Sequence, residues 1–220
     1  PTKLCFLLCH QVASSFHGSK AFPVGDSVPR FFPFYNNHRY QPRTKDERLQ
    51  EYQHIDHGFG PVFDSRSHVL ILGSFPSVLS RQNSFYYGNP QNRFWHVIAA
   101  CVGAPTPPNT PLNTSIQAKR QLLKDAGIAL WDVIESCDIK GSADSTIRHA
   151  VPANLNIIFD AASIEAVYAN GRTAETLYRR LAEAHTKRPI IGLPSTSPAN
   201  AAWSKERLID SWKKALDPYL

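Results

Sequence analysis

From residue 68 onward, short apolar runs alternate with segments of helical periodicity, and this alternation strongly limits the possible folds. The apolar runs are residues 68–72 (HVLIL), 128–134 (IALWDVI), 164–171 (IEAVYANG) and 188–194 (RPIIGLP). Short runs of this kind, closed by glycine, proline or polar residues, are typical of buried parallel strands. The pattern predicts an α/β fold, a three-layer α/β/α sandwich around a mostly parallel four-stranded sheet.

The segments between the runs are predicted to be helical. Ser115 has the side chain of a helix N-cap, and Gly127 stands where the same helix should have ended. The expected helices are residues 93–103, 115–127, 172–185 and 201–216, with shorter ones at 144–151 (DSTIRHAV) and 154–162 (NLNIIFDAA).

The first 54 residues differ from the rest of the chain. They are dense in proline and aromatic residues without a clear period, and only residues 44–53 could form a short helix. We expect residues 1–54 to be an irregular, disordered extension and residues 55–220 to be one domain, since 220 residues suffice for a full core.

Composition limits the kinds of partner and the cellular compartment that are expected. A formal charge of +6 and a pI of about 9.2 fit an anionic partner such as nucleic acid. No apolar run approaches the ~20 residues of a membrane span, so no membrane contact is expected. Cys5, Cys9, Cys101 and Cys137 match neither a zinc site nor a disulfide scaffold. These features predict reduced thiols and an intracellular protein, in the cytoplasm or nucleoid, or in the nucleus of a eukaryote.

Two loops follow predicted strands, at the sheet edge where α/β folds bind ligands. Residues 73–95 (GSFPSVLSRQNSFYYGNPQNRFW) are small, amide and aromatic, with Arg81 and Arg93 the only charges, which is typical of a pocket lining. Residues 193–200 (LPSTSPAN) combine two prolines with three hydroxyls. Such a loop favours phosphate contact, and a helix-capping turn is the alternative.

Several familiar motifs are missing. The first strand is followed by one glycine rather than Gly-x-Gly-x-x-Gly, and the chain has neither a Walker-type Gly-Lys-Ser/Thr nor a Gly-x-Ser-x-Gly elbow. No His-x-x-x-His or acidic cluster indicates a catalytic metal. We therefore predict no cofactor and no metal, and the four cysteines are not expected to hold an iron–sulfur cluster.

Residues 58–216 resemble the uracil-DNA glycosylase superfamily, most closely its hypoxanthine-DNA glycosylase branch. The matching pieces, in order, are HGFGPVFDSRSHVLILGSFPS, FYYGNPQNRFW, ALWDVIESCDIKGSADSTIR, the NG of residues 170–171, and LPSTSPAN. The resemblance implies an enzyme that flips a damaged base out of duplex DNA and hydrolyses its glycosidic bond. Residues 55–220 are then the catalytic domain, with deaminated double-stranded DNA as partner and a monomer expected.

The resemblance also suggests the catalytic residue. In mismatch-directed relatives the first loop reads Gly-x-Asn-Pro-Gly, and its asparagine positions water. This chain has Phe75 at that place, a departure that the hypoxanthine branch shares. The resemblance moves the role to Asn92, with Asn89 as the alternative. A helix N-cap is the other interpretation of Asn92.

The remaining site residues follow from the same resemblance. Tyr87 matches the aromatic residue that stacks on the flipped base, although core packing also explains it. Gly73, Ser74 and Phe75 are expected to line the base pocket, and Asp132 and Asp144 are possible polar lining, with a helix cap the alternative for Asp144. The predicted DNA-binding residues are Ser195, Thr196, Ser197 and Pro198, the last near the wedge position.

The sequence thus predicts removal of hypoxanthine from deoxyinosine. Neither loop contains lysine, so a monofunctional enzyme that uses water is expected rather than a lyase. A histidine that uracil-specific relatives carry in the second loop is missing. Excision of uracil, xanthine or a mismatched base remains the alternative, as does a catalytically silent DNA-binding relative, because Phe75 replaces the usual asparagine.

Overall fold

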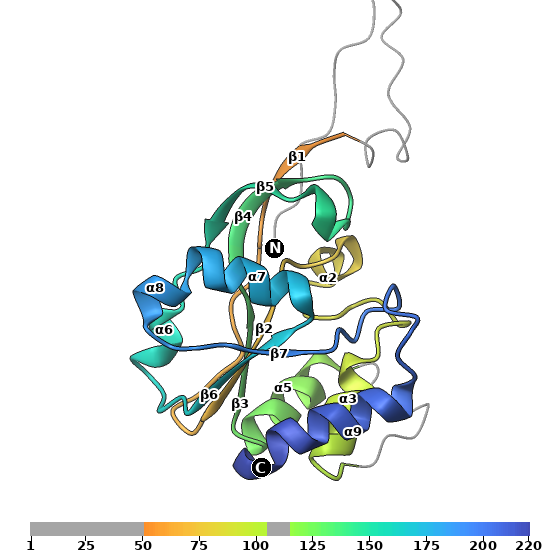
Figure 1. The fold of residues 1–220 in the computed structure, drawn as a ribbon, viewed down its shortest axis with the longest axis vertical. Helices are drawn as coiled ribbons and strands as arrows, with labels where there is room; N and C mark the ends of the chain where they lie inside the picture. Colours follow the sequence, from red (N-terminus) through yellow and green to blue (C-terminus); the bar gives the residue numbers. More distant parts are fainter. Residues whose placement is uncertain (1–50, 105–114) are drawn as a thin grey trace, which may run out of the picture. The chain divides into compact units, whose positions relative to one another are not determined.

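A four-stranded parallel sheet forms the centre of the computed structural model, which describes residues 51–104 and 115–220 (Figure 1). The strands lie in the order β3-β2-β6-β7. Every residue of β2 (Val69–Gly73) and β3 (Ile128–Asp132) is buried, as their apolar sequences require. The other two strands are β6 (Ala166–Asn170), which pairs with β2, and β7 (Ile191–Leu193), which is the edge strand beyond β6.

Helices cover both faces of this sheet (Figure 1). One face carries α3 (Phe94–Cys101), α5 (Ile116–Asp125) and α9 (Lys205–Leu216). The other carries α6 (Asn156–Phe159), α7 (Arg172–Leu181) and α8 (Glu183–Thr186). A short helix α2 (Val78–Gln82) follows β2, and a 3₁₀ turn η2 (Asp217–Tyr219) follows α9. The predicted three-layer α/β/α sandwich is confirmed.

The two residues predicted to bound helix α5 have the expected roles. The Ser115 side chain accepts a hydrogen bond from the Ala118 N–H at 3.2 Å and caps the helix. Gly127 has a φ of +65°, and a Cβ there would collide with the His68 ring, so glycine is required just past the helix end. These two residues fix where the helix begins and ends.

A second, antiparallel sheet was not predicted. It has the order β1-β4-β5, from β1 (Gln53–Asp56), β4 (Ile134–Ile139) and β5 (Arg148–Pro152). The predicted helix at residues 144–151 is therefore wrong: only η1 (Asp144–Thr146) is helical, because the next residues pair with β4 instead.

Strand β1 spans the predicted domain boundary at residue 54. Gln53 and His54 pair with Ile139 and Asp138 of β4, so they belong to the second sheet. Residues 1–50, which hold most of the predicted extension and most of the possible helix at 44–53, lie outside the described residues. The proposed extension therefore stays a prediction.

The topology brings the strand ends together. From β2 the chain runs to β3 on one side and then to β6 on the other, so a switch point lies between β2 and β6. Connections to opposite faces leave a crevice beyond the carboxyl ends of such strands. Gly73, Asp132, Asn170 and Pro194, each at or just beyond the end of a different strand, all line one cavity there.

Candidate active site

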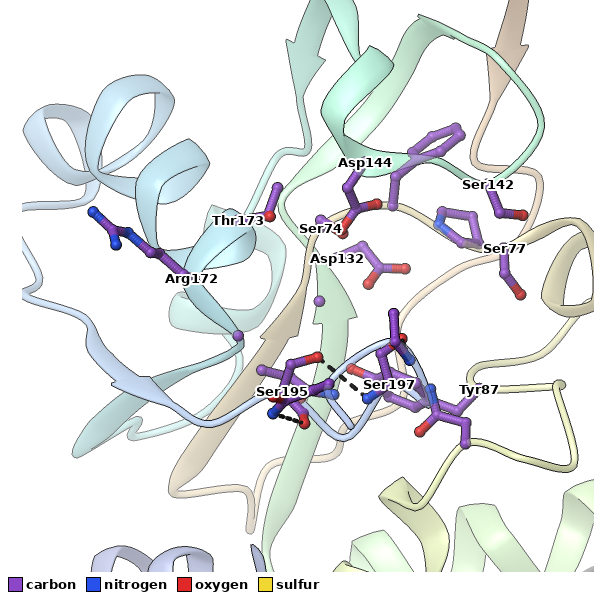
Figure 2. Close-up of a pocket in the computed structure, with 18 of the residues that line it drawn as sticks. Ser74, Ser77, Tyr87, Asp132, Ser142, Asp144, Arg172, Thr173, Ser195 and Ser197 are labelled. Carbon is purple, nitrogen blue, oxygen red and sulfur yellow. Dashed lines mark hydrogen bonds between the residues drawn. The ribbon is translucent and has the colours of Figure 1, made fainter. Parts of the chain in front are cut away.

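A cavity of about 1000 Å³ opens at the carboxyl edge of the parallel sheet. The ends of β2, β3 and β6 form its floor, and the loops after β2 and β7 form its walls. Figure 2 shows the Asp132 side chain in its middle, between Ser74 and Asp144 on one side and the loop of Ser195 and Ser197 on the other. The volume is large enough for a nucleobase with part of its sugar.

Gly73 leaves room for two polar groups on the cavity floor. A Cβ at Gly73 would lie 2.0 Å from Asp132 Oδ1 and 3.1 Å from the Tyr87 hydroxyl. Gly73 and Asp132 are register partners in β2 and β3, so both strands would resist the displacement. The absence of a side chain at Gly73 thus lets a carboxylate oxygen and a phenol hydroxyl lie close together.

The Asp132 carboxylate is buried, with 4% of the residue exposed. Its Oδ2 accepts a hydrogen bond from His57 Nε2 at 2.9 Å. Within residues 51–104 and 115–220, no group hydrogen-bonds Oδ1. A buried carboxylate is stabilised by hydrogen bonds to its oxygens. Oδ1 is therefore available to accept a hydrogen bond from a ligand.

Tyr87 combines a packing role with a place in the cavity wall. One ring face stacks on Phe94, with centroids 3.9 Å apart and planes 24° apart. Its φ of +51° lies in the left-handed region, which costs a tyrosine about 1 kcal/mol. The hydroxyl is buried and has no hydrogen-bond partner in the described part of the chain. Burial, then the charge of Asp132, raises the pKa of Tyr87 above 10.0, against the opposing effect of the nearby Asn170 amide, so the hydroxyl keeps its proton.

Ser74 and Phe75 form the wall beside Asp132. Phe75 is buried and lines the cavity. The Ser74 hydroxyl donates to Asp144 Oδ2 at 2.8 Å. Burial raises the pKa of Asp144, against the opposing effect of the Ser74 hydrogen bond and with a further rise from the charge of Asp132. The structure therefore brings all four predicted pocket residues to one cavity.

Asn92 lines the same cavity, and its oxygen is already occupied. Oδ1 accepts hydrogen bonds from the Phe94 N–H at 3.0 Å and from the Thr196 hydroxyl at 2.9 Å. The backbone donor identifies this atom as the oxygen of the amide. The N-cap position of α3 is held by Arg93, so Asn92 lies one residue before it, and it accepts the N–H of Phe94, the first helical residue, from a place in the pocket wall. Only the amide NH₂ is left for a ligand.

Asn89 also lines the cavity. Its Oδ1 accepts from the Gln91 N–H at 2.9 Å, and its main-chain oxygen accepts from the Asn92 N–H at 2.9 Å. Both hydrogen bonds close the turn that carries Asn92. Asn89 thus shapes the loop that presents Asn92, while its own amide nitrogen stays available.

Thr196 is placed differently from the neighbouring hydroxyls. It is fully buried, and its hydroxyl donates to Asn92 Oδ1 and accepts from Asn170 Nδ2, each at 2.9 Å. Its N–H donates to Asn170 Oδ1 at 2.9 Å. Thr196 therefore joins the loops after β2, β6 and β7, and its buried hydroxyl is used within the protein.

Ser195 and Ser197 line the cavity and are partly exposed, and Pro198 is exposed at the loop tip. The Ser195 hydroxyl oxygen accepts the Ser197 N–H at 3.2 Å, and that of Ser197 accepts the Ala199 N–H at 3.3 Å. In both cases the oxygen accepts, so the hydroxyl proton remains free to donate. The second loop therefore presents two free O–H donors at its surface.

Arg93 fixes the second loop through hydrogen bonds to its main chain, a role that the sequence did not reveal. Its guanidinium donates to the main-chain oxygens of Ser197 at 2.7 Å, Asn200 at 3.0 Å and Thr196 at 3.3 Å, and also to that of Trp203. No carboxylate among the described residues pairs with it. The first loop thus supplies both the clamp and a positive charge beneath the hydroxyls. Its only signal in the sequence is an isolated charge in a pocket-lining loop.

Sequence reasoning missed three other residues in part or whole. Asp132 and Asn170 both end apolar runs at the sheet edge, and Asp132 was expected as possible lining only. His57, the first residue of the matching piece HGFGPVFDSRSHVLILGSFPS, precedes the first predicted strand and was given no role. Among the described residues, no group of three or more His, Cys, Asp or Glu side chains is arranged to hold a metal ion. None of the described helices has the length and apolarity needed to cross a bilayer.

Comparisons with known proteins agree with this geometry. Residues 58–217 match the family model described as the uracil DNA glycosylase superfamily. A protein of Methanosarcina acetivorans named hypoxanthine DNA glycosylase is 34% identical over 157 residues, which are 70% of this chain and 93% of that protein. One of Methanosarcina barkeri with the same name is 32% identical over 116 residues, or 52% and 70% of the two chains. The solution structure of a candidate uracil DNA glycosylase from M. acetivorans aligns with a TM-score of 0.61 at 30% identity, covering 74% of this chain and 96% of that one.

Proposed function

The chain belongs to the uracil DNA glycosylase superfamily and is a DNA N-glycosylase, and from this premise we propose that it excises hypoxanthine from deoxyinosine in duplex DNA. The product is an abasic site. Two relatives named hypoxanthine DNA glycosylase support this choice of base.

The observation that carries the proposal is the pair of free groups over Gly73, the acceptor Asp132 Oδ1 and the donor Tyr87 hydroxyl. Deamination of adenine converts N1 from an acceptor into an N–H donor and replaces the C6 amino donor with a carbonyl acceptor. Hypoxanthine therefore presents a donor beside an acceptor, which complements this pair. Adenine presents the reverse order. The acceptor Asp132 Oδ1 would then face the acceptor N1, and the Tyr87 hydroxyl donor would face the amino donor.

Asn92 supplies the catalytic contact in this proposal. Cleavage of the glycosidic bond builds negative charge on the departing base and positive charge on the sugar. Since Asn92 Oδ1 is occupied by Phe94 and Thr196, its NH₂ group is the part that acts, by donating to the departing base. Donation to the base is thus favoured over the alternative in which the carbonyl oxygen holds the attacking water.

Water is the proposed nucleophile. No lysine is among the described residues that line the cavity, so nothing there offers an amine for a Schiff base. Ser195 and Ser197 are proposed to donate to DNA phosphates, with Pro198 at the position vacated by the flipped base. The proposed enzyme therefore cuts the glycosidic bond and leaves the DNA backbone intact.

Uracil is the second candidate base, because its N3–H beside O4 offers the same donor and acceptor order as hypoxanthine. Xanthine shares it at N1 and O6. The structural neighbour described as a candidate uracil DNA glycosylase supports keeping uracil in the comparison. A catalytically silent relative would bind such duplexes and cut none of them.

One assay separates these functions. Duplexes with a single inosine, uracil, xanthine or adenine are incubated with the protein and then with alkali, and strand cleavage is read on a gel. We expect inosine to be processed fastest and adenine not at all, with an Asp132→Ala preparation as the control for contaminating activity. Faster cleavage of the uracil duplex would make uracil, rather than hypoxanthine, the preferred substrate. Binding without any cleavage would show that the protein is a catalytically silent relative.

A further inference from the structure

His57 is the buried histidine nearest the proposed base pocket, and the mechanism above does not use it. The residue is 1% exposed and is not among those that line the cavity. Its Nε2 lies 2.9 Å from Asp132 Oδ2. Because a carboxylate accepts and cannot donate, the hydrogen in this bond is on Nε2.

The surroundings of His57 fix its ring. Phe59, Phe75 and Tyr86 pack around it with ring centroids 4.4, 6.2 and 5.9 Å away. Its backbone N–H donates to the Glu135 oxygen at 2.7 Å, which ties the residue to β4. Its Nδ1 is buried and has no partner in the described part of the chain. The ring therefore holds Asp132 through one hydrogen bond, from a position set by aromatic packing.

This hydrogen bond decides how many acceptors the pocket offers. A free carboxylate has two oxygens in one plane and readily accepts two adjacent N–H donors. With Oδ2 engaged by His57, only Oδ1 remains over Gly73. We propose that His57 is a positioning residue that makes Asp132 a single acceptor, and that this sets the base specificity by disfavouring guanine.

The chemistry of the bases explains why the number of acceptors matters. Hypoxanthine and guanine share N1–H and O6, and they differ only by the 2-amino group of guanine. Two adjacent carboxylate oxygens would bind guanine N1–H and N2–H together, and would favour the normal base over the deaminated one. One oxygen binds N1–H alone and leaves the 2-amino group without a partner, which carries a desolvation penalty. This inference rests on the proposed reading of the base edge by Asp132.

The test compares binding of inosine and guanine without requiring catalysis. Each base is placed opposite an abasic-site analogue, so that neither has to break a base pair, and affinities are measured by fluorescence anisotropy. The wild-type protein should bind the inosine duplex at least about fivefold more tightly than the guanine duplex. Equal affinities in the wild type would overturn the proposal whatever the variants do.

Three variants locate the effect. His57→Leu removes the donor and should bring the inosine-to-guanine affinity ratio close to one. His57→Gln keeps an N–H donor and should retain most of the wild-type ratio. Phe59→Leu disturbs the same aromatic cluster, without touching the hydrogen bond, and should leave the ratio unchanged. If all three variants shift the ratio alike, packing rather than the hydrogen bond sets it, and the proposal is wrong.

Folding and function are checked separately. Thermal melts show whether each variant is folded, and a duplex with an abasic analogue in place of the base should bind to all of them alike. Inosine cleavage by the wild type tests the proposed function by itself. A wild type that cuts uracil and spares inosine would reject hypoxanthine as the substrate. The affinity ratios of His57→Leu and His57→Gln would still decide the role of His57.

Discussion

The two loops at the carboxyl edge of the sheet differ in how they are held and in what they present. The first, residues 73–95, is anchored by buried aromatic side chains such as Phe85 and Trp95, whose rings stack 5.7 Å apart. The second, residues 193–200, is held largely by hydrogen bonds to residues outside it, the guanidinium of Arg93 and the amide of Asn170. The position of the first loop is therefore set by its packing in the core. The position of the second loop depends on hydrogen bonds to the first.

The polar groups of the two loops differ in the same way. In the first loop the available groups face the cavity, such as the amide of Asn92 and the hydroxyl of Tyr87. In the second, the available hydroxyls of Ser195 and Ser197 lie near the surface, while Thr196 is buried between the loops. This contrast suggests a division of labour, with base chemistry in the first loop and backbone contact in the second.

The largest expected effect is at Asn92. Asn92→Ala should lower single-turnover cleavage of an inosine duplex by ~10²–10³, because one preorganised donor to the departing base is lost. It should also cost ~0.5–2 kcal/mol of stability, since the Phe94 N–H loses its acceptor. Single-turnover rates and thermal melts on one preparation measure both.

Asn92→Asp separates these two consequences. The carboxylate keeps an acceptor for Phe94 and Thr196 but has no NH₂ to donate, so stability should be nearly restored while the rate stays low. Asn89→Ala is the matched control in the same turn. A normal rate for Asn92→Asp would reduce Asn92 to a helix cap, and a large loss at Asn89 alone would move the catalytic role there.

A smaller effect is expected at Arg93, where the two loops meet. Arg93→Lys keeps the charge and loses the planar fork that reaches four carbonyl oxygens, so it should cost about 2 kcal/mol of stability and weaken DNA binding roughly tenfold. Arg93→Ala should do the same and also flatten the dependence of affinity on salt. Chemical denaturation and anisotropy titrations measure these effects.

Arg81 provides the control for Arg93, because it lies in the first loop but donates to the oxygens of Pro76 and Gly141. Arg81→Ala should leave the second loop in place and change DNA affinity less than either Arg93 variant does. Equal losses at both arginines would mean that general charge, and not the clamp, supports DNA binding.

The smallest effect is expected at the surface hydroxyls. Ser195→Ala and Ser197→Ala should each weaken duplex binding by a few-fold, evenly across sequences, and leave the salt slope nearly unchanged, because a neutral hydroxyl releases no counterion. Thr196→Val offers the contrast in the same loop: it removes a buried hydroxyl that bonds Asn92, so it should lower the cleavage rate more than the affinity. Unchanged affinity in both serine variants would remove them from the DNA-binding account.

The sequence predicted the parallel sheet and the edge that carries the site because buried strands and capped helices leave strong local signals. Ser115, Gly127 and the run at residues 68–72 are examples. The antiparallel sheet was missed because its outer strands β1 and β5 are short and mostly exposed, and pairing with β4 outweighs their own weak periodicity.

The site was predicted unevenly for a similar reason. Residues within the two loops could be singled out as candidates because each loop is unusual as a stretch of sequence. The partners that give them their chemistry come from elsewhere: His57 lies 75 residues before Asp132, and Thr196 lies 104 residues after Asn92. Such pairs exist only once the chain has folded, so neither spacing nor composition could show that Asn92 has only its NH₂ left to donate.

The division of labour between the loops is tested most directly by measuring rate and affinity for two variants side by side. Asn92→Asp and the double variant Ser195→Ala/Ser197→Ala are compared with wild type in saturating single-turnover cleavage of inosine and in affinity for an abasic-analogue duplex. We predict that Asn92→Asp loses ~10²–10³ in rate with affinity within about threefold of wild type. The serine variant should lose affinity and keep its rate within about threefold. Parallel losses of rate and affinity in both variants would contradict the account.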